Sequence, residues 1–142
     1  MDMTSGYHQA PINQNSRKWT AFMTPFGIFE WQRLPMGLKG APANFQRIFA
    51  TVVLAGLIHI TCEQYLDDTI MPASSEEEFI ERLTTILERF EKHDITVNPD
   101  KCVFGVSTVT AVGHTINDQG VHFTREKLDS VLNFPNLRRK NN

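Results

Sequence analysis

The clearest pattern of apolar and polar positions lies between residues 75 and 92. Ser75 followed by Glu78 forms a capping box, which is typical of a helix start, and three acids in the first turn complement the helix dipole. An apolar stripe at helical spacing follows: Phe79, Leu83, Ile86, Leu87 and Phe90. The opposite positions are acidic: Glu81, Glu88 and Glu91. We therefore predict an amphipathic helix whose stripe is core and whose acidic face is solvated.

A second helix and two hairpins are predicted before this segment. The helix begins near Pro42, which suits a first helical turn, and ends near Gly56. Its apolar face consists of Phe45, Ile48, Phe49, Val52 and Val53. Residues 19–22 and 28–31 are aromatic and β-branched, and they flank a Pro/Gly turn at 24–27, which indicates a hairpin. Residues 64–71 indicate a second hairpin, with Asp67 and Asp68 at its tip.

The C-terminal part predicts short strands and one more helix. Residues 95–97 form a strand ended by a proline, and 103–105 and 109–116 form a further pair. A turn is predicted at 117–120. Thr124 caps a last helix that ends before Pro135 and turns Leu128, Val131 and Leu132 inward. We expect one α+β domain over 1–135, with helices on one face of an antiparallel sheet, and a disordered basic tail at 136–142.

Composition narrows the function classes. The 142 residues are 41% hydrophobic and 21% charged, which is ordinary for a soluble domain. The longest apolar run, at 52–60, is too short and interrupted to cross a membrane, and no signal-peptide pattern follows Met1. Two unpaired cysteines suit an intracellular setting. The net charge of −2, from 14 basic and 16 acidic residues, lacks the surplus that grips a nucleic-acid backbone. Composition alone therefore does not favour a nucleic-acid partner, unless the cationic regions that bind the phosphates lie elsewhere.

Three carboxylates are the first candidates for chemistry: Asp2, Asp67 and Asp68. Two-metal nucleotidyl transfer uses acids from separate strands to hold two Mg²⁺ ions roughly 3.5–4 Å apart. An upstream Asp2 with an Asp pair on a hairpin is compatible with that layout. Taken alone, a solvated Asp-Asp turn is the preferred interpretation, because turns favour aspartate for local hydrogen bonding.

Five motifs resemble, in order, those of one family. They are Asp2-Met3-Thr4-Ser5-Gly6-Tyr7-His8-Gln9, the segment from Leu34-Pro35-Met36-Gly37 to Phe45-Gln46, Tyr65-Leu66-Asp67-Asp68, Asn98-Pro99-Asp100-Lys101-Cys102, and Val112-Gly113-His114. Together they cover nearly the whole chain from Asp2 to Pro135. The succession resembles the palm of reverse transcriptases from gypsy-type long-terminal-repeat retrotransposons. This resemblance implies a polymerase palm with a ferredoxin-like core and the start of a thumb-side connection.

The resemblance implies a role for each matching residue. Asp2 and Asp67 would bind two Mg²⁺ directly, Asp68 would be the third acid, and Mn²⁺ could substitute. The dNTP would contact Tyr7, under the deoxyribose, and Lys101, near the triphosphate. The pocket loop would be Pro35, Met36 and Gly37, and the primer grip Val112, Gly113 and His114. Plainer interpretations stay open: a core aromatic for Tyr7, a surface lysine for Lys101, an ordinary turn at 35–37 and a structural histidine for His114.

The chain also departs from the family pattern. We expect the fingers before Asp2, and the thumb and ribonuclease H regions after Pro135, to be missing, which would account for the absent positive charge. Glu63 and Gln64 stand where relatives usually carry two apolar strand residues. Burying Glu63 unpaired would cost at least about 2 kcal/mol, so this strand is expected to be weakened or exposed at an edge.

These observations lead to one main hypothesis and two alternatives. The main one is RNA-directed DNA polymerase activity within a retrotransposon polyprotein, acting on an RNA or DNA template, a DNA primer and dNTPs. The isolated fragment would be weak or inactive, and an active element would place it in cytoplasmic virus-like particles, with no membrane partner. The first alternative is a non-catalytic remnant that binds nucleic acid or protein. The second, a Cys/His metal site, lacks recognisable ligand spacing: His59, Cys62, Cys102 and His114.

Overall fold

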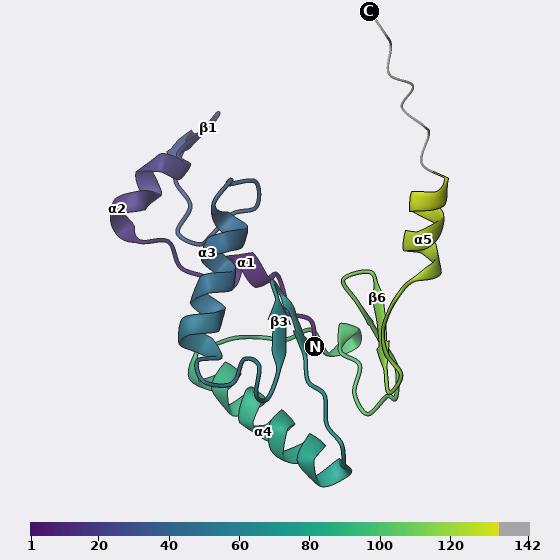
Figure 1. Cartoon of the computed structure of the whole chain (residues 1–142). Coiled ribbons are helices and arrows are strands. Elements are labelled where there is room, and N and C mark those ends of the chain that lie inside the picture. Colours follow the sequence, from purple (N-terminus) through teal and green to yellow (C-terminus); the bar gives the residue numbers. More distant parts are fainter. Residues whose placement is uncertain (134–142) are drawn as a thin grey trace, which may run out of the picture. The chain divides into compact units, whose positions relative to one another are not determined.

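The computed structural model describes residues 1–133 (Figure 1). The chain forms two compact units, Met1–Phe104 and a second unit that begins at Gly105. The expected tail at 136–142, and Pro135, lie outside the described residues. No helix among residues 1–133 is long and apolar enough to cross a membrane.

Helices and small antiparallel sheets alternate along the chain, so the predicted α+β class is confirmed. The α-helices are α1 (Gly6–Gln9), α2 (Gln14–Arg17), α3 (Ala41–Ile48), α4 (Glu76–Lys92) and α5 (Arg125–Leu132). Two short 3₁₀ helices, η1 (Lys18–Thr20) and η3 (Pro99–Lys101), and the π-helical η2 (Phe49–Val53) accompany them. The strands are β1 (Phe22–Thr24), β2 (Gly27–Phe29), β3 (Glu63–Tyr65), β4 (Asp68–Ile70), β5 (Val109–Ala111), β6 (His114–Asn117) and β7 (Gly120–Phe123).

Within residues 1–133 the strands form three separate sheets, β1–β2, β3–β4 and β5–β6–β7, in place of one continuous sheet. Single antiparallel bridges extend β3–β4: Asp2 pairs with Asp68, and Met3 pairs with Val97. The predicted strand at 95–97 is reduced to that one bridge. Its length is limited because Asp94, directly before it, has a φ of 55° and η3 begins directly after Asn98.

The core of the first unit lies between α3, η2 and α4. Its fully buried large side chains include Phe45, Phe49, Leu54, Ile86 and Phe90. Each such side chain contributes roughly 1.5–3 kcal/mol by leaving water. Arg89 of α4 donates to the carbonyl oxygens of Val53 and Ala55, at 3.2 and 3.0 Å, and so satisfies the end of η2.

Two predicted core positions of the first unit are exposed, which corrects the sequence interpretation. The side chain of Val52 is 51% exposed and that of Leu87 is 40% exposed. Val52 lies in η2, where the wider π-helical turn changes the angle between successive side chains. Leu87 follows the buried Ile86 and therefore lies at the margin of the stripe.

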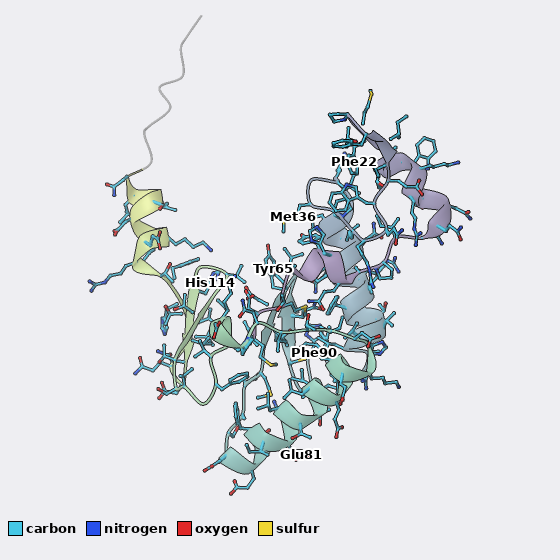
Figure 2. All side chains as sticks on the ribbon, turned by 180° about the vertical axis from the view of Figure 1, so that it is seen from behind. Phe22, Met36, Tyr65, Glu81, Phe90 and His114 are labelled. Carbon is cyan, nitrogen blue, oxygen red and sulfur yellow. The ribbon has the colours of Figure 1, made fainter. Side chains whose placement is uncertain are left out.

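The Ser75 cap of α4 forms as predicted, and Glu78 bonds the residue before the cap in place of Ser75 itself. Ser75 Oγ accepts from the Glu78 backbone N–H at 3.2 Å, and Glu78 Oε2 accepts from the Ser74 backbone N–H at 2.7 Å. In Figure 2, Glu81 lies on the outer side of α4 and Phe90 lies among the packed side chains. Apart from Leu87, the two faces of this helix thus match the predicted acidic and apolar faces.

The second unit consists of the β5–β6–β7 meander followed by α5. The run 109–116, predicted as one strand, folds back at Val112 and Gly113, whose φ angles are 51° and 72°. Residues 103–105 are not a strand; Gly105 has a φ of 63°. The turn at 117–120 and the Thr124 cap are confirmed. The predicted inward residues of α5 are exposed, because this unit provides no buried core for them among its described residues: Leu128, Val131 and Leu132.

Candidate functional site

Two of the three candidate carboxylates lie opposite each other on neighbouring extended segments. Asp2 and Asp68 form an antiparallel bridge, and the backbone is held on both sides by Thr69 N–H to Met1 O and Asn98 N–H to Asp2 O, each 2.9 Å. Side chains of paired residues project from the same face of a sheet. Met3, the next residue, is 2% exposed, so its side chain points into the core while that of Asp2 points outward. The fold therefore places these two acids on one outward face.

Asp67 belongs to the turn that connects β3 and β4. Tyr65 pairs directly with Asp68, so the two-residue turn consists of Leu66 and Asp67. The prediction that Asp67 and Asp68 both occupy the tip is thereby corrected, since Asp68 is the first residue of β4. Leu66 has a φ of 54°, a conformation that costs a residue with a Cβ about 1–2 kcal/mol.

Gly6, at the start of α1, lies against this turn. A Cβ built at Gly6 would lie 3.0 Å from Asp67 Cβ and 3.3 Å from the Phe45 ring. Gly6 is buried, and only a residue without a side chain allows α1 to approach the Asp67 backbone this closely. Gly6 lies in the first motif, but the sequence pattern does not indicate this contact.

The charges at this site interact. The pKa of Asp68 is raised above its ordinary value of 3.8, first because burial penalises the charged form, then because Asp67 and Asp2 are also negative, with the N-terminal ammonium opposing them. Lys101 Nζ lies 4.0 Å from Asp2 Oδ1, with both side chains accessible, so this ion pair contributes little. The structure thus brings Lys101 beside the acids, as a partner of Asp2.

The three carboxylates fit a divalent cation in their chemistry and in their backbone placement. Carboxylate oxygens are hard donors that Mg²⁺ prefers, and a dication would relieve the repulsion that raises the Asp68 pKa. In their side-chain positions within residues 1–133, no three His, Cys, Asp or Glu groups converge closely enough to hold a metal ion. Binding of one ion by all three acids would therefore require these side chains to move towards one another, whereas one or two carboxylates with waters are enough for Mg²⁺.

The alternative Cys/His ligands of the first unit have other partners. His59 Nδ1 lies 2.9 Å from Glu63 Oε2, and Glu63 is exposed at the edge strand β3, as predicted. Burial, with the nearby Glu63 charge, raises the pKa of Cys62 to about 11, so its thiol stays protonated. A protonated thiol is a poor metal ligand, and these contacts do not favour a Cys/His metal site.

The predicted nucleotide-pocket loop lines a pocket of about 460 Å³. Its walls are His8, Thr20, Trp31, Pro35, Met36, Gly37 and Leu38. The His8 and Trp31 rings stack in parallel across 5.7 Å. Figure 2 shows Met36 in this part of the first unit, and its side chain is 70% exposed. His8 and Trp31 were not predicted as site residues; in the sequence they are marked only by the position after Tyr7 and by the aromatic strand pattern.

Tyr7 lies beside the pocket and packs against the core. Its ring stacks on Phe45 with centroids 5.1 Å apart, and it is not among the pocket-lining residues. Successive residues of α1 thus have three environments, with Gly6 against Asp67, Tyr7 against Phe45 and His8 at the pocket.

Of the predicted primer-grip residues, Val112 and Gly113 form the turn between β5 and β6 in the second unit, and His114 begins β6. His114 Nδ1 lies 2.9 Å from Val112 O, and its ring packs on Phe123 at 5.1 Å. Gly113 O accepts from the backbone N–H and the hydroxyl of Thr124, both at 3.3 Å. These contacts fix the turn and tie it to the start of α5.

Comparison with known proteins agrees with this arrangement. The family described as reverse transcriptase (RNA-dependent DNA polymerase) matches residues 1–116. The retrovirus-related Pol polyprotein from transposon 412 of Drosophila melanogaster is 34% identical over 95% of this chain and 11% of its own length. The transposon Tf2-3 polyprotein of Schizosaccharomyces pombe is 30% identical over 94% of this chain and 10% of its own length.

Solved structures give the same result. The foamy viral protease-reverse transcriptase in complex with dsDNA has a TM-score of 0.77 at 25% identity, covering 94% of this chain and 27% of that one. Its complex with an RNA/DNA hybrid gives 0.78 at 25% identity, over 93% and 18%. The fold is that of an α+β polymerase palm, and the chain spans about a tenth of the length of its curated relatives. The chain belongs to the reverse transcriptase family.

Proposed function

We propose that this chain is the catalytic palm segment of an RNA-directed DNA polymerase from a retrotransposon polyprotein. The observation that carries the proposal is the bridge between Asp2 and Asp68, which sets two acids on one face with Asp67 in the adjoining turn. Acids on neighbouring strands are what two-metal nucleotidyl transfer requires, because a sheet fixes the ligand spacing.

Each residue takes a role in that reaction. Two Mg²⁺ ions would be held by Asp2 and Asp67, with Asp68 as the third acid; when bound, they activate the primer 3′-hydroxyl and stabilise the charge on the phosphoryl oxygens. Lys101, beside Asp2, would contact the triphosphate. Pro35, Met36 and Gly37 would hold the nucleotide from the pocket wall.

Tyr7 and the β5–β6 turn complete the assignment. Tyr7 would select the deoxyribose through the flat face of its ring, which the stack on Phe45 holds in one plane. Val112, Gly113 and His114 would contact the primer terminus through the backbone, which the hydrogen bonds of Gly113 and His114 keep in place.

Template and primer are the proposed macromolecular partners. The foamy viral relatives were solved with dsDNA and with an RNA/DNA hybrid, which supports an RNA or DNA template with a DNA primer. The net charge of −2 does not supply the cations for gripping phosphates. Efficient synthesis is therefore proposed to need fingers, thumb and ribonuclease H regions from the rest of the polyprotein, and the cytoplasmic virus-like particle is its proposed location. Alone, this chain is expected to extend a primer weakly or not at all, because positioning provides most of the catalysis in phosphoryl transfer.

The test is a Mn²⁺ titration of the isotope-labelled full chain, followed by two-dimensional NMR. Mn²⁺ stands in for Mg²⁺ and broadens nearby amide signals. We expect selective broadening around Asp2, Asp67 and Asp68, and its loss in Asp67→Asn. Glu81→Gln, an exposed acid on the outer face of α4, is the matched control and should leave the broadening unchanged.

Two outcomes contradict the proposal. One is a folded chain with no selective broadening at the three acids. The other is broadening that Asp67→Asn leaves intact, which would place the ion elsewhere and favour a non-catalytic remnant.

A further inference from the structure

Two glutamine side chains form hydrogen bonds with the backbone of Leu66, in the turn that carries Asp67. We call this pair, Gln46 and Gln64, the glutamine bracket. Gln46, on α3, accepts from the Leu66 backbone N–H through Oε1 at 2.7 Å. Gln64, on β3, donates from Nε2 to the Leu66 carbonyl oxygen at 2.6 Å. Gln46 Nε2 also donates to the Gln64 carbonyl oxygen at 3.1 Å, which joins the two residues. Both polar groups of the Leu66 backbone are thus held by side chains.

Leu66 needs such support because of its conformation. Its φ of 54° at the first position of a two-residue hairpin turn is one that glycine adopts readily and leucine does not. Asp67 follows directly, so the direction of its side chain depends on the Leu66 dihedral angles. If Leu66 relaxed, Asp67 would turn away from the face shared by Asp2 and Asp68.

The bracket lies on the protected side of the hairpin. Gln64 pairs with Thr69, which is 1% exposed, and both glutamines are half-buried between α3 and β3. Directed hydrogen bonds are stronger where water is partly excluded. An apolar residue at 64 would have no donor for the Leu66 carbonyl, so this contact depends on the amide of Gln64.

We propose that Gln46 and Gln64 are positioning residues that hold Leu66 in the left-handed conformation and thereby set the direction of Asp67. This proposal concerns the turn alone. Its consequence, that the positioning of Asp67 strengthens binding of a divalent cation, rests on the proposed function.

The first experiment needs no metal. Gln46→Met and Gln64→Met each remove the amide and keep an unbranched side chain, and Gln14→Met, at an exposed position of α2, is the matched control. Losing one hydrogen bond should speed Leu66 amide exchange in Gln46→Met by about three- to tenfold. In both Gln46→Met and Gln64→Met, the scalar coupling between the Leu66 amide proton and Hα should move away from the value of the left-handed conformation. Gln64→Met keeps the test valid if Gln46→Met fails to fold.

A glycine rescue separates positioning from general packing. Leu66→Gly adopts the turn without strain, so adding Gln46→Met to Leu66→Gly should shift the Asp67 amide signal far less than Gln46→Met alone does. An equal shift in both backgrounds, or unchanged Leu66 exchange and coupling in both bracket variants, overturns the proposal.

The second experiment measures Mn²⁺ affinity in the same variants. Residues that orient metal ligands typically change affinity by 10–100-fold, so Gln46→Met should weaken binding by about tenfold, with recovery in the Leu66→Gly background. If the wild-type chain binds no Mn²⁺, the proposed function fails and the bracket is judged on the metal-free data. If it binds Mn²⁺ and Gln46→Met binds equally well, the positioning role fails and the proposed function survives.

Discussion

The two units of this chain hold their candidate functional residues in different ways. In the first unit, buried apolar side chains from Met3 to Phe90 form a continuous cluster beneath the face that carries Asp2 and Asp68. In the second unit, none of the described residues from Gly105 to Asn133 is buried. Its turn at Val112 and Gly113 is held by strand pairing and by hydrogen bonds to Thr124 and His114.

This difference has a physical consequence. Packing resists displacement of a backbone in every direction, because any movement opens a cavity or creates a clash. Strand pairing and a few exposed hydrogen bonds resist less, because water can replace them at small net cost. The carboxylates should therefore keep their backbone positions under mutations that shift the β5–β6 turn.

The largest expected effect comes from removing an aromatic ring from the core. Phe45 is fully buried and contacts both Tyr7 and Phe49, so Phe45→Ala should cost about 3–5 kcal/mol of unfolding free energy. Phe123→Ala is the counterpart in the second unit; that ring is 57% exposed, so its loss should cost less than about 1 kcal/mol. In urea unfolding, tryptophan fluorescence reports on the first unit, which contains Trp19 and Trp31, and circular dichroism on the same samples also reports on the second unit. Equal losses would contradict the contrast between the units.

A methyl group at Gly6 should have the next largest effect. Its Cβ would meet Asp67 Cβ at 3.0 Å, so Gly6→Ala should cost about 1–3 kcal/mol and displace the Asp67 backbone. Gly40→Ala is the control, because its new Cβ would meet only the flexible Asn44 side chain at 3.4 Å. Chemical shifts of Asp67 and its neighbours, with thermal unfolding, measure both effects. A Gly6→Ala chain with unshifted Asp67 signals would show that α1 does not restrain the turn.

The two helix caps give a smaller and more selective effect. Ser75→Ala should lower the unfolding free energy of the first unit by about 1 kcal/mol, since Ser75 caps α4, which supplies Ile86 and Phe90 to the core. Thr124→Ala should reduce the helicity of α5 and leave the unfolding midpoint of the first unit unchanged. Circular dichroism and tryptophan fluorescence on the same samples separate the two readouts. A shift of the fluorescence midpoint in Thr124→Ala would mean that the units unfold together.

The sequence predicted the elements that depend on local pattern. The α4 cap, the buried positions Phe45, Phe49, Ile86 and Phe90, and the 117–120 turn follow from spacing and residue type. The exposed edge at Glu63 followed from the cost of burying a charge. These are properties that a short window of sequence determines.

The remaining features depend on what packs against each segment. The prediction that Leu128, Val131 and Leu132 of α5 are buried was wrong. The sequence pattern shows that these residues are apolar, but their exposure depends on what packs over them. The division of 109–116 required a positive φ at Val112, which β-branched residues rarely adopt. At the site, the motifs located the three acids, but the Gly6–Asp67 approach and the stacking of His8 on Trp31 join residues far apart in sequence.

The smallest expected effect is a pH dependence of the unfolding free energy, which measures how strongly folding of the first unit shifts the ionisation of Asp68. The pKa of Asp68 is raised in the folded state, chiefly by burial, so the folded chain binds the proton more tightly than the unfolded chain does. Below a pH of about 3.8, the ordinary value, Asp68 is protonated in both states and contributes nothing. As the pH rises through and above that value, ionised Asp68 destabilises the fold. Asp68→Asn should therefore be more stable than the wild-type chain at pH 7, with the difference vanishing towards pH 3.

Glu78, in the same unit, should give a pH dependence of stability with the opposite sign. Its pKa is lowered, first by the hydrogen bond from the Ser74 backbone N–H, so its carboxylate adds stability above its ordinary value of 4.5 that is lost as the pH falls. Glu78→Gln should be less stable than the wild-type chain at pH 7 and equal to it in acid. Urea unfolding of both variants from pH 3 to 7 gives two curves that diverge from the wild type in opposite directions. Curves that run in parallel for Asp68→Asn would mean that folding leaves the ionisation of this acid unchanged. The contrast between the two units would then fail at the face that carries Asp2 and Asp68.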